Sequence, residues 1–300
     1  MLPLDVIQPG AAPPPNRHPS WIKVRAPHGE RYERVKDLMR GHRLHTVCEE
    51  ARCPNMGECW GHGTATFLLM GEICTRACRF CAVKGGKPEP LDPGEPEAVA
   101  EVVRSLGLEF TVLTSVDRDD LPDQGADHIA RTVEAIRRLL PSCGVEALVP
   151  DFRGVRECVE RIARSPLTVF AHNVETVEGL YRSVRPGARY ERSLRVLEMA
   201  KEAVPSLLTK SGLMLGLGET REEVEDCLSD LRDHGCDIVT LGQYLRPSPE
   251  QLPVVRYLTP AEFEELREAA RAFGFRQVVS GPLVRSSYHA WEAKEAAEGR

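Results

Sequence analysis

Residues 64–81 read TATFLLMGEICTRACRFC and join the two features that decide the fold. The first, residues 64–70, is a short apolar run of the kind that forms a buried strand in a parallel sheet. The second is a group of three cysteines with the spacing C-x3-C-x2-C, namely Cys74, Cys78 and Cys81. A tetrahedral zinc or a four-iron cluster held by protein alone needs four ligands, and no cysteine or histidine follows at a short interval. Either a distant residue completes the site or one metal position stays open.

Six further apolar runs follow and alternate with helical patterns. The runs occupy residues 109–115, 145–150, 167–173, 208–217, 236–242 and 276–281. One of the helical patterns begins with Thr220 three residues ahead of Glu223, which is the signature of a capping box. Strand and helix alternate about every 30 residues, as in βα units. The pattern therefore predicts a whole or partial (β/α) barrel rather than an antiparallel sandwich.

In such barrels the chemistry lies at the carboxyl ends of the strands. Besides the cysteine loop, the predicted strands are followed by polar stretches at 114–121, 150–152, 172–176, 216–219 and 242–248. The whole chain holds only three asparagines, so Asn173 in one of these stretches is hard to attribute to general loop composition. Any single Asp or Asn there can equally cap a helix. Together the stretches predict one polar barrel mouth.

Composition limits the function further. The chain has 300 residues, 42% hydrophobic and 28% charged, which fits a soluble protein with one large core and an appendage. A net charge of −6 argues against a nucleic-acid partner, which normally requires a basic face. The first residues lack a basic region followed by a long apolar run, and no other stretch approaches the length of a bilayer span. We therefore expect a cytoplasmic protein without nucleic-acid or membrane partners.

Cysteine is concentrated near the start of the chain. Six of the ten cysteines lie between residues 48 and 81, and Cys48, Cys53 and Cys59 form a second group, C-x4-C-x5-C. In a reducing compartment such groups favour metal ligation over disulfides. Residues 1–20 are Pro-rich and predict a flexible arm, and residues 21–63 predict an irregular segment whose order depends on what the cysteines bind. Four isolated cysteines are expected to be buried apolar side chains: Cys143, Cys158, Cys227 and Cys236.

The C-x3-C-x2-C loop, with Phe80 before its last cysteine, resembles the defining loop of the radical S-adenosylmethionine (SAM) superfamily. The resemblance implies a four-iron cluster on three cysteines, whose fourth iron binds the amino and carboxylate groups of SAM. One electron then cleaves the sulfonium to a 5′-deoxyadenosyl radical, chemistry that belongs to the cofactor. Residues 212–219, GLMLGLGE, resemble the superfamily's glycine-containing strand that packs against adenine.

Within that superfamily the chain resembles the lipoyl synthases from roughly residue 35 to residue 290. The resemblance rests on the second cysteine group and on CWGHGTATFLLMG (59–71), TSVDRDDLPDQGA (114–126) and SGPLVRSSYHA (280–290). It implies insertion of two sulfur atoms at C6 and C8 of a protein-bound octanoyl group. Removing hydrogen from such unactivated carbons needs a radical, because no side-chain base can do it.

The resemblance also implies a second [4Fe-4S] cluster, the auxiliary cluster, as the sulfur donor. Its expected ligands are Cys48, Cys53, Cys59 and the catalytic Ser287, whose oxygen is harder than thiolate and should be released more easily. The implied fold is a partial (β/α)6 TIM-like barrel of the radical SAM type at 64–275. An N-terminal extension at 1–63 carries the auxiliary cysteines, and a C-terminal segment at 276–300 closes on the auxiliary cluster.

The remaining implied contacts concern SAM and protein partners. Phe80 is expected to approach adenine, and the amino acid or ribose portions of SAM are expected to contact Ser115, Asp117, Asn173 and Glu175. Arg285 either orients the auxiliary cluster or pairs with an acid.

The implied partners are an octanoylated E2 lipoyl domain or glycine-cleavage H protein, a reduced ferredoxin or flavodoxin, and an iron–sulfur carrier that rebuilds the cluster. The segment from Lys23 to Arg43 is rich in basic residues, and either docks an acidic carrier or is simply a solvated face.

Three alternatives have distinct signatures. A zinc site would need a fourth protein ligand. Among other radical SAM sulfur-insertion enzymes, biotin synthase lacks a leading C-x4-C-x5-C group, and a methylthiotransferase would carry an RNA-binding domain for which this chain has neither length nor basic charge. A two-cluster electron-transfer protein of the ferredoxin type would need four thiolates for each cluster and no barrel.

Overall fold

The computed structural model describes residues 18–23, 29–61, 66–287 and 290, and its centre is a curved, mainly parallel sheet. Seven strands run parallel and follow one another in space in their order along the chain. Each lies within a predicted apolar run or extends one residue beyond it, so the prediction of alternating buried strands is confirmed. They are β2 (Thr66–Leu69), β5 (Phe110–Ser115), β6 (Gly144–Leu148), β7 (Val169–Ala171), β8 (Leu208–Leu215), β9 (Ile238–Gln243) and β10 (Gln277–Gly281).

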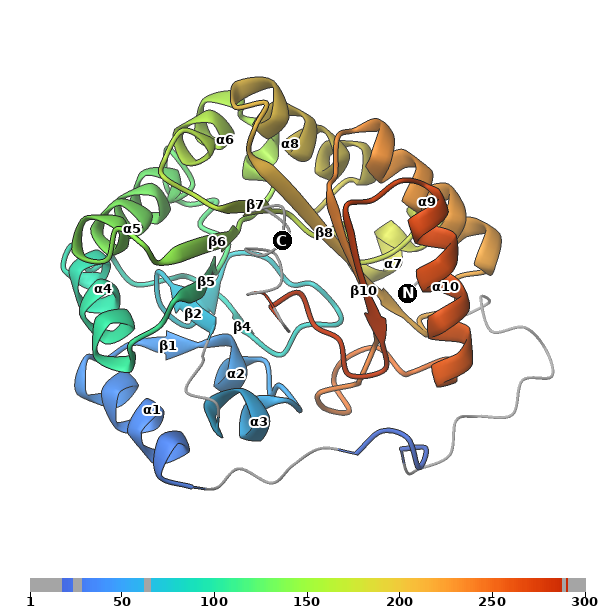
Figure 1. Cartoon of the computed structure of the whole chain (residues 1–300), viewed down its shortest axis with the longest axis horizontal. Helices are drawn as coiled ribbons and strands as arrows, with labels where there is room; N and C mark the ends of the chain where they lie inside the picture. Colours follow the sequence, from blue (N-terminus) through green and yellow to red (C-terminus); the bar gives the residue numbers. More distant parts are fainter. Residues whose placement is uncertain (1–17, 24–28, 62–65, 288–289, 291–300) are drawn as a thin grey trace.

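The sheet is an arc rather than a closed barrel (Figure 1). In the part of the chain that the structure describes, the strand order begins with β1 (His45–Thr46), which pairs antiparallel with β2, and ends with β10. The predicted partial barrel is therefore confirmed. Its last parallel strand, β10, belongs to the C-terminal segment at 276–300. The first part of this segment is therefore a strand of the sheet.

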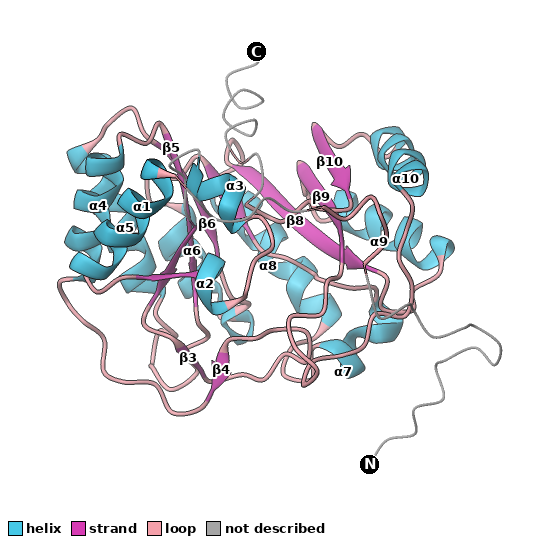
Figure 2. Cartoon of the chain, turned by 90° about the horizontal axis from the view of Figure 1, so that it is seen from below, coloured by secondary structure: helices cyan, strands magenta, loops and turns pink. Residues whose placement is uncertain are grey.

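Amphipathic helices cover the outer face of the arc. Figure 1 shows them outside the strands, where their apolar residues pack against the sheet. The capping box predicted at Thr220 and Glu223 is present at the start of α9, and Thr259 and Glu262 form another at the start of α10. The covering helices are α4 (Glu95–Leu106), α5 (Ala126–Leu139), α6 (Arg156–Ala163), α8 (Tyr190–Ala203), α9 (Arg221–Asp233) and α10 (Pro260–Ala272). The four-residue α7 (Tyr181–Val184) lies instead at the loop end of the sheet (Figure 2), where the carbonyl oxygen of Val184 accepts from the amide of Arg79.

The N-terminal extension is more regular than the sequence pattern predicted. It contains α1 (Glu30–Gly41), α2 (Val47–Glu50) and α3 (Met56–Gly61), so the expectation of an irregular segment at 21–63 was wrong. Val35 and Met39, four residues apart, are both buried, and the ring of Tyr32 lies 5.0 Å from that of Trp60. A few well-spaced apolar residues thus suffice for a docked helix, although they leave only a weak periodic signal. The Pro-rich residues 1–17 lie outside the described residues.

The interior of the sheet contains a buried ion pair. The ammonium nitrogen of Lys210 on β8 lies 3.0 and 2.9 Å from the two carboxylate oxygens of Glu146 on β6, and both residues are buried. Two short strands, β3 (Ile73–Cys74) and β4 (Lys84–Gly85), lie among the loops at one end of the sheet (Figure 2). No helix within the described ranges is long and apolar enough to cross a membrane.

Candidate active site

The cysteine loop leaves β2 through a fixed turn. Met70 and Gly71 have φ values of 68° and 90°, which reverse the chain direction just after the strand. The amide of Met70 donates to both carboxylate oxygens of Glu95, at 3.2 and 2.9 Å, and the second oxygen also lies 2.6 Å from Nε2 of His128. Because these groups belong to α4 and α5, the helices behind the sheet fix where the loop begins.

Backbone contacts hold the loop against the end of β5. Thr75 donates to the carbonyl oxygen of Asp117 through its amide at 3.0 Å and its hydroxyl at 2.9 Å. The sulfur of Cys74 accepts from the amides of Arg76 and Asp117, at 3.4 and 3.3 Å, and the sulfur of Cys81 accepts from Val83 at 3.5 Å. Amide donors aimed at sulfur stabilise thiolates, which are the form that binds iron.

Arg76, inside the loop, ties it to two strand ends. Its guanidinium lies 2.8 Å from Asp119, 2.8 Å from Asp151 and 3.3 Å from Asp117, and only 7% of the side chain is exposed. The hydrogen bond from Arg76 holds the pKa of Asp119 below its usual range. The loop is therefore anchored on charged residues that follow β5 and β6.

The three loop thiols share a buried, acidic environment. Burial, with a contribution from Asp117, raises the pKa of Cys74 to about 12. Burial raises the pKa of Cys81 to about 11, with Cys78 and Glu175 acting in the same direction. Without metal these thiols stay protonated, so a bound cationic centre is what would stabilise three thiolates here.

Asn173 and Glu175 follow β7 and lie beside β8. Asn173 donates through Nδ2 to the carboxylate of Glu175 at 3.1 Å, and Glu175 pairs through its backbone with Gly212 and Met214, at 2.9 Å each. Gly212 gives Asn173 room, since a Cβ there would lie 3.1 Å from Oδ1 of Asn173. This is a close approach of the kind that explains a glycine within a strand. Two of the predicted SAM contacts are thus brought together.

Buried polar atoms without a partner mark where a ligand fits. Among the described residues, such atoms at this end of the barrel are Oγ of Ser115, Nε2 of His172, Oδ1 of Asn173, Oγ1 of Thr176 and Nε of Arg185. Leaving a buried donor or acceptor unpaired costs about 1–3 kcal/mol, so a cluster of them is typical of groups that bind a polar ligand. Ser115 and Asn173 are both predicted SAM contacts, and their free atoms fit the polar portions of SAM.

Phe80 and the glycine run of β8 have structural contacts of their own. Phe80 is half-buried against the second apolar cluster, which includes residues of α9, β9 and α10. Gly216 has a φ of 99°, and a Cβ there would lie 2.4 Å from the carbonyl oxygen of Arg256. The glycine is therefore required by the close approach of residue 256, and contact of this run with adenine stays a prediction.

The second cysteine group forms a separate cluster. Cys48 is buried in α2, Cys59 lies in α3, and Cys53 lies in the turn between them. Burial raises the pKa of Cys48 to about 11, with Cys53 acting in the same direction. Burial raises the pKa of Cys59 to about 12, with Cys48 and Cys53 acting in the same direction. The three thiols are therefore within electrostatic reach of one another, as ligands of one metal centre must be.

The C-terminal segment passes the end of β9 and contacts the second cysteine group. Asn55, between two of the cysteines, donates through Nδ2 to the carbonyl oxygen of Leu283 at 2.7 Å. Burial raises the pKa of Cys53, and the positive charge of Arg285 acts to lower it. Gly242 lets the segment pass, because a Cβ there would lie 2.2 Å from the carbonyl oxygen of Val284. Arg285 forms no ion pair with an acid in the described ranges. Its Nη1 donates to the carbonyl oxygens of Gln243 and Val284, and its role beside the cysteines stays a prediction.

The same segment also reaches the radical SAM side of the site. Ser286 accepts a hydrogen bond of 2.5 Å from Nδ2 of Asn173, and the half-buried Ser287 follows in the same turn. The segment thus contacts the second cysteine group through the bond from Asn55 to Leu283, and the predicted SAM contacts through Ser286. Sequence reasoning singled out Ser287 and missed Ser286, Asn55, Arg76 and Arg185. The pair of adjacent serines was the only signal for Ser286.

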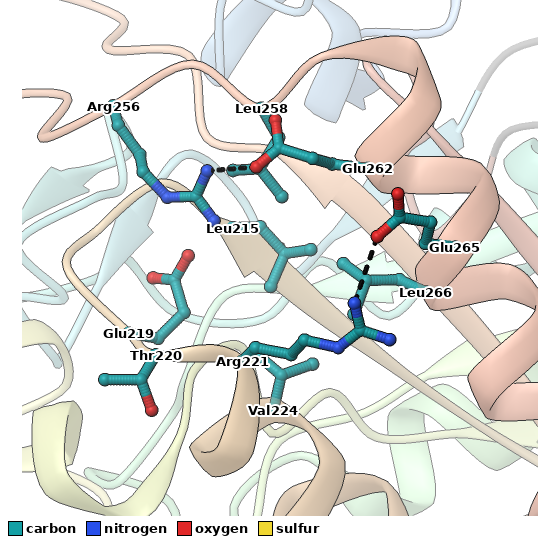
Figure 3. A pocket seen from close by; sticks show the side chains of 10 residues that line it. All are labelled: Leu215, Glu219, Thr220, Arg221, Val224, Arg256, Leu258, Glu262, Glu265 and Leu266. Carbon is teal, nitrogen blue, oxygen red and sulfur yellow. Dashed lines mark hydrogen bonds and ion pairs between the residues drawn. The ribbon is translucent and has the colours of Figure 1, made fainter.

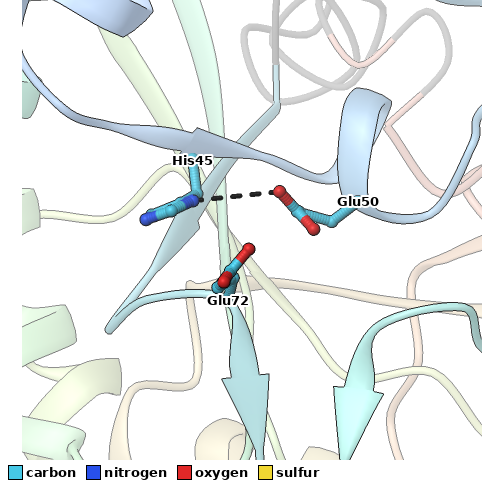
Figure 4. A group of neighbouring side chains, drawn as sticks. All are labelled: His45, Glu50 and Glu72. Atoms are coloured by element: carbon cyan, nitrogen blue, oxygen red, sulfur yellow. Dashed lines mark ion pairs between the residues drawn. The ribbon is translucent and has the colours of Figure 1, made fainter. Parts of the chain in front are cut away.

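Two other groups of polar side chains lie nearby. His45, Glu50 and Glu72 place possible ligand atoms within 4.8 Å of one another (Figure 4). Both oxygens of Glu72 are already 3.2 Å from the ammonium of Lys84, and we assign no metal to this group.

A small pocket between the end of β8 and helices α9 and α10 is bordered by the ion pairs Arg256–Glu262 and Arg221–Glu265 (Figure 3). None of the cysteines lines it. The four isolated cysteines are buried as predicted.

Comparison with known proteins gives two matching family models. Residues 68–231 match the radical SAM superfamily, and residues 11–53 match the N-terminal domain of lipoyl synthase of the radical SAM family. A lipoyl synthase of Methylococcus capsulatus is 56% identical over 95% of this chain and 88% of its own length. Lipoyl synthases of Nitrosococcus oceani and Chloroflexus aurantiacus are 57% and 54% identical, covering 91% and 97% of this chain and 85% and 96% of their own lengths.

Solved structures resemble the fold. Methylornithine synthase superposes with a TM-score of 0.54 at 15% identity, covering 83% of this chain and 75% of its own. Streptococcus suis SuiB bound to S-adenosylmethionine superposes with a TM-score of 0.55 at 12% identity, covering 73% of this chain and 50% of its own. At this level of identity the likeness concerns the fold alone.

Proposed function

Because this chain belongs to the lipoyl synthase family of the radical SAM superfamily, we propose that it is a sulfurtransferase that inserts two sulfur atoms into a protein-bound octanoyl group. The positions are C6 and C8, and the product is the lipoyl cofactor. Membership of the superfamily implies a [4Fe-4S] cluster and SAM. When bound, these supply an organic radical able to remove hydrogen from an unactivated carbon.

The chain's own residues hold and orient that chemistry. Cys74, Cys78 and Cys81 are the proposed cluster ligands, on a loop fixed by the Arg76 ion pairs and by amides aimed at sulfur. Asn173 and Ser115, each with a buried unpaired oxygen, would bind the polar portions of SAM. Asp117, Glu175 and Phe80 complete the proposed contacts. No residue is needed as a general base, since the carbon to be attacked is not acidic.

The second cysteine group is the proposed site of the sulfur-donating auxiliary cluster. Cys48, Cys53 and Cys59 would hold three irons and Ser287 the fourth. The observation that carries this proposal is the segment at 283–287, whose Leu283 carbonyl accepts a hydrogen bond from Asn55, between two of the cysteines, while its Ser286 accepts one from Asn173. A ligand at Ser287 would lie on the short path between sulfur donor and SAM. Because an oxygen ligand is harder than thiolate, it suits a cluster that gives up its sulfur.

Variants of Ser287 test this assignment. We expect Ser287→Ala to keep SAM cleavage and to make little or no lipoyl product. We expect Ser287→Cys to keep the cluster through a softer ligand and also to insert sulfur poorly. The measurement pairs 5′-deoxyadenosine formed with sulfur incorporated in one anaerobic reaction, and Ser286→Ala is the neighbouring control for loss of a hydroxyl. Normal two-sulfur yields from both Ser287 variants would show that Ser287 is not a ligand, and only the three cysteines would remain as assigned protein ligands of the auxiliary cluster.

The proposed partners are an octanoylated lipoyl domain of an E2 subunit or the glycine-cleavage H protein, a reduced ferredoxin or flavodoxin, and an iron–sulfur carrier. An acidic carrier would dock on α1, where Arg31 and Arg40 are exposed and Arg34 donates to the carbonyl oxygen of Ser105 at 2.6 Å. Charge reversal at the three arginines should weaken carrier binding and reduce its dependence on salt. Unchanged binding in both respects would exclude this surface. A cytoplasmic location also stays a prediction.

A further inference from the structure

Arg185 is a buried cation held rigidly beneath the cysteine loop. The residue is 9% exposed and follows α7. Its Nη1 donates to the carbonyl oxygens of Asn173 and Val174, at 2.8 and 3.3 Å, and to the hydroxyl of Tyr181 at 2.9 Å. The guanidinium carbon also lies 5.5 Å from the centre of the Tyr181 ring. With one nitrogen shared among three acceptors and the plane set beside an aromatic ring, the group has a single orientation.

The backbone around Arg185 carries the cysteine loop. The amide of Arg79, the residue after Cys78, donates to the carbonyl oxygen of Val184 at 2.9 Å. The Arg79 side chain adds a bond of 3.3 Å from Nη1 to the carbonyl oxygen of Ser183. The middle cysteine of the triad is therefore docked on the segment that contains the cation.

The charge of Arg185 lies within electrostatic reach of Glu175 and of the Cys78 thiol. It forms no ion pair with an acid among the described residues, and its buried Nε lacks a hydrogen-bond acceptor. Burial of a charge costs several kcal/mol unless it is compensated. Burial raises the pKa of Cys78, and the charge of Arg185 acts in the opposite direction. The cation therefore acts on the sulfur that the proposed function assigns to iron, in a site that it shares with Glu175.

We propose that Arg185 is a positioning residue that raises the reduction potential of the cluster bound by Cys74, Cys78 and Cys81. The proposal rests on the proposed function, since it needs a cluster at this loop. Reduction adds one negative charge to the cluster. A buried positive charge close to a ligand sulfur stabilises the reduced form. In a site of low dielectric this effect is larger than for a charge in water.

The experiment compares reduction potentials in the complete enzyme. Wild type, Arg185→Gln and Arg185→Lys are reconstituted anaerobically with iron and sulfide, and the midpoint potential is followed by electron paramagnetic resonance. The signal that changes on adding SAM identifies the radical cluster, and the auxiliary cluster serves as an internal reference. Arg79→Gln is the matched control, because it removes the same charge one residue from Cys78 but from an exposed side chain.

We expect Arg185→Gln to shift the potential of the SAM-responsive cluster to more negative values and to leave the reference cluster unchanged. Arg185→Lys should shift it less, because the ammonium keeps the charge but cannot reproduce the bonds of the guanidinium to the backbone carbonyls and Tyr181 that fix its position. Arg79→Gln should match wild type, since solvent screens that charge.

A fully loaded Arg185→Gln with the wild-type potential would overturn the proposal, and so would an equal shift in Arg79→Gln. If Arg185→Gln takes up no iron, Arg185→Lys decides: a wild-type potential there overturns the proposal. Failure of the proposed function looks different, because a wild-type protein with no SAM-responsive cluster would exclude the cluster itself. A normal wild-type cluster whose potential ignores Arg185 would leave the proposed function standing.

Discussion

Replacing Asn55 by Ala should release the C-terminal segment from the N-terminal extension. Asn55 is 4% exposed and lies between two cysteines of the auxiliary group. Its Nδ2 donates to the carbonyl oxygen of Leu283 at 2.7 Å, a contact between residues 228 positions apart. Because the next residues of that segment include Arg285 and Ser287, this bond holds the proposed fourth ligand at the auxiliary site.

The size of the effect follows from the burial of Asn55 and the half-buried position of Leu283. Removing the donor leaves the carbonyl of Leu283 unsatisfied, which costs about 1–3 kcal/mol. The equilibrium between docked and released segment should therefore shift by roughly 5- to 150-fold toward release, at 1.4 kcal/mol for each factor of ten. The barrel itself keeps all its contacts, so the loss should be local.

Amide hydrogen exchange of residues 282–286, together with iron retention under chelator, measures the release. We expect faster exchange in this segment and faster loss of auxiliary iron, with the SAM-responsive cluster unchanged. The control is Ser280→Ala, which removes another buried side-chain donor to a backbone carbonyl, that of Phe263 at 2.7 Å, but not the contact with the extension. Normal exchange and iron retention in Asn55→Ala, or equal effects in the control, would refute the reasoning.

Three further changes test other parts of the account. Cys78→Ala should abolish both 5′-deoxyadenosine and lipoyl product while the auxiliary iron remains, and any cleavage of SAM by this variant on reduction would show the loop assignment to be wrong. Burial lowers the pKa of His172 to about 4, so the unfolded chain takes up a proton as the pH falls from 6.5 while the folded chain does not. Stability should accordingly be complete above pH 6.5 and decrease by about 3 kcal/mol toward pH 4, and urea unfolding of His172→Gln should lack this part of the pH dependence. Lys210→Met should destabilise the fold by about 3–5 kcal/mol, because it leaves Glu146 buried without its partner. Adding Glu146→Leu should recover most of that loss. Equal unfolding midpoints for the single and the double variant would disprove this expectation.

The strands could be predicted because buried parallel strands leave continuous apolar runs between turn signals. The runs at 64–70 and 208–217, for example, contain β2 and β8. The cysteine groups could be found because ligands on one short loop must lie close in sequence as well as in space. Both kinds of feature are local, so a single sequence contains them.

What could not be predicted depends on contacts between distant segments. Nothing near Asn55 indicates that its amide binds Leu283, and nothing near Asn173 indicates a bond to Ser286, 113 residues away. Arg185, in the stretch RSVRPG, is indistinguishable in sequence from an exposed loop arginine, although it is buried. Helix α1 was missed because two buried residues, Val35 and Met39, provide most of its docking and give little periodicity.

The central claim is that this chain inserts sulfur into an octanoyl group on a carrier protein. The most direct measurement incubates the anaerobically reconstituted enzyme with SAM, a reductant and an octanoylated lipoyl domain, and follows the intact mass of the domain. The account predicts a species that has gained two sulfur atoms, formed together with 5′-deoxyadenosine and with loss of sulfide from the enzyme. Cleavage of SAM without any gain of sulfur, on an octanoylated E2 lipoyl domain and on an octanoylated H protein alike, would contradict it.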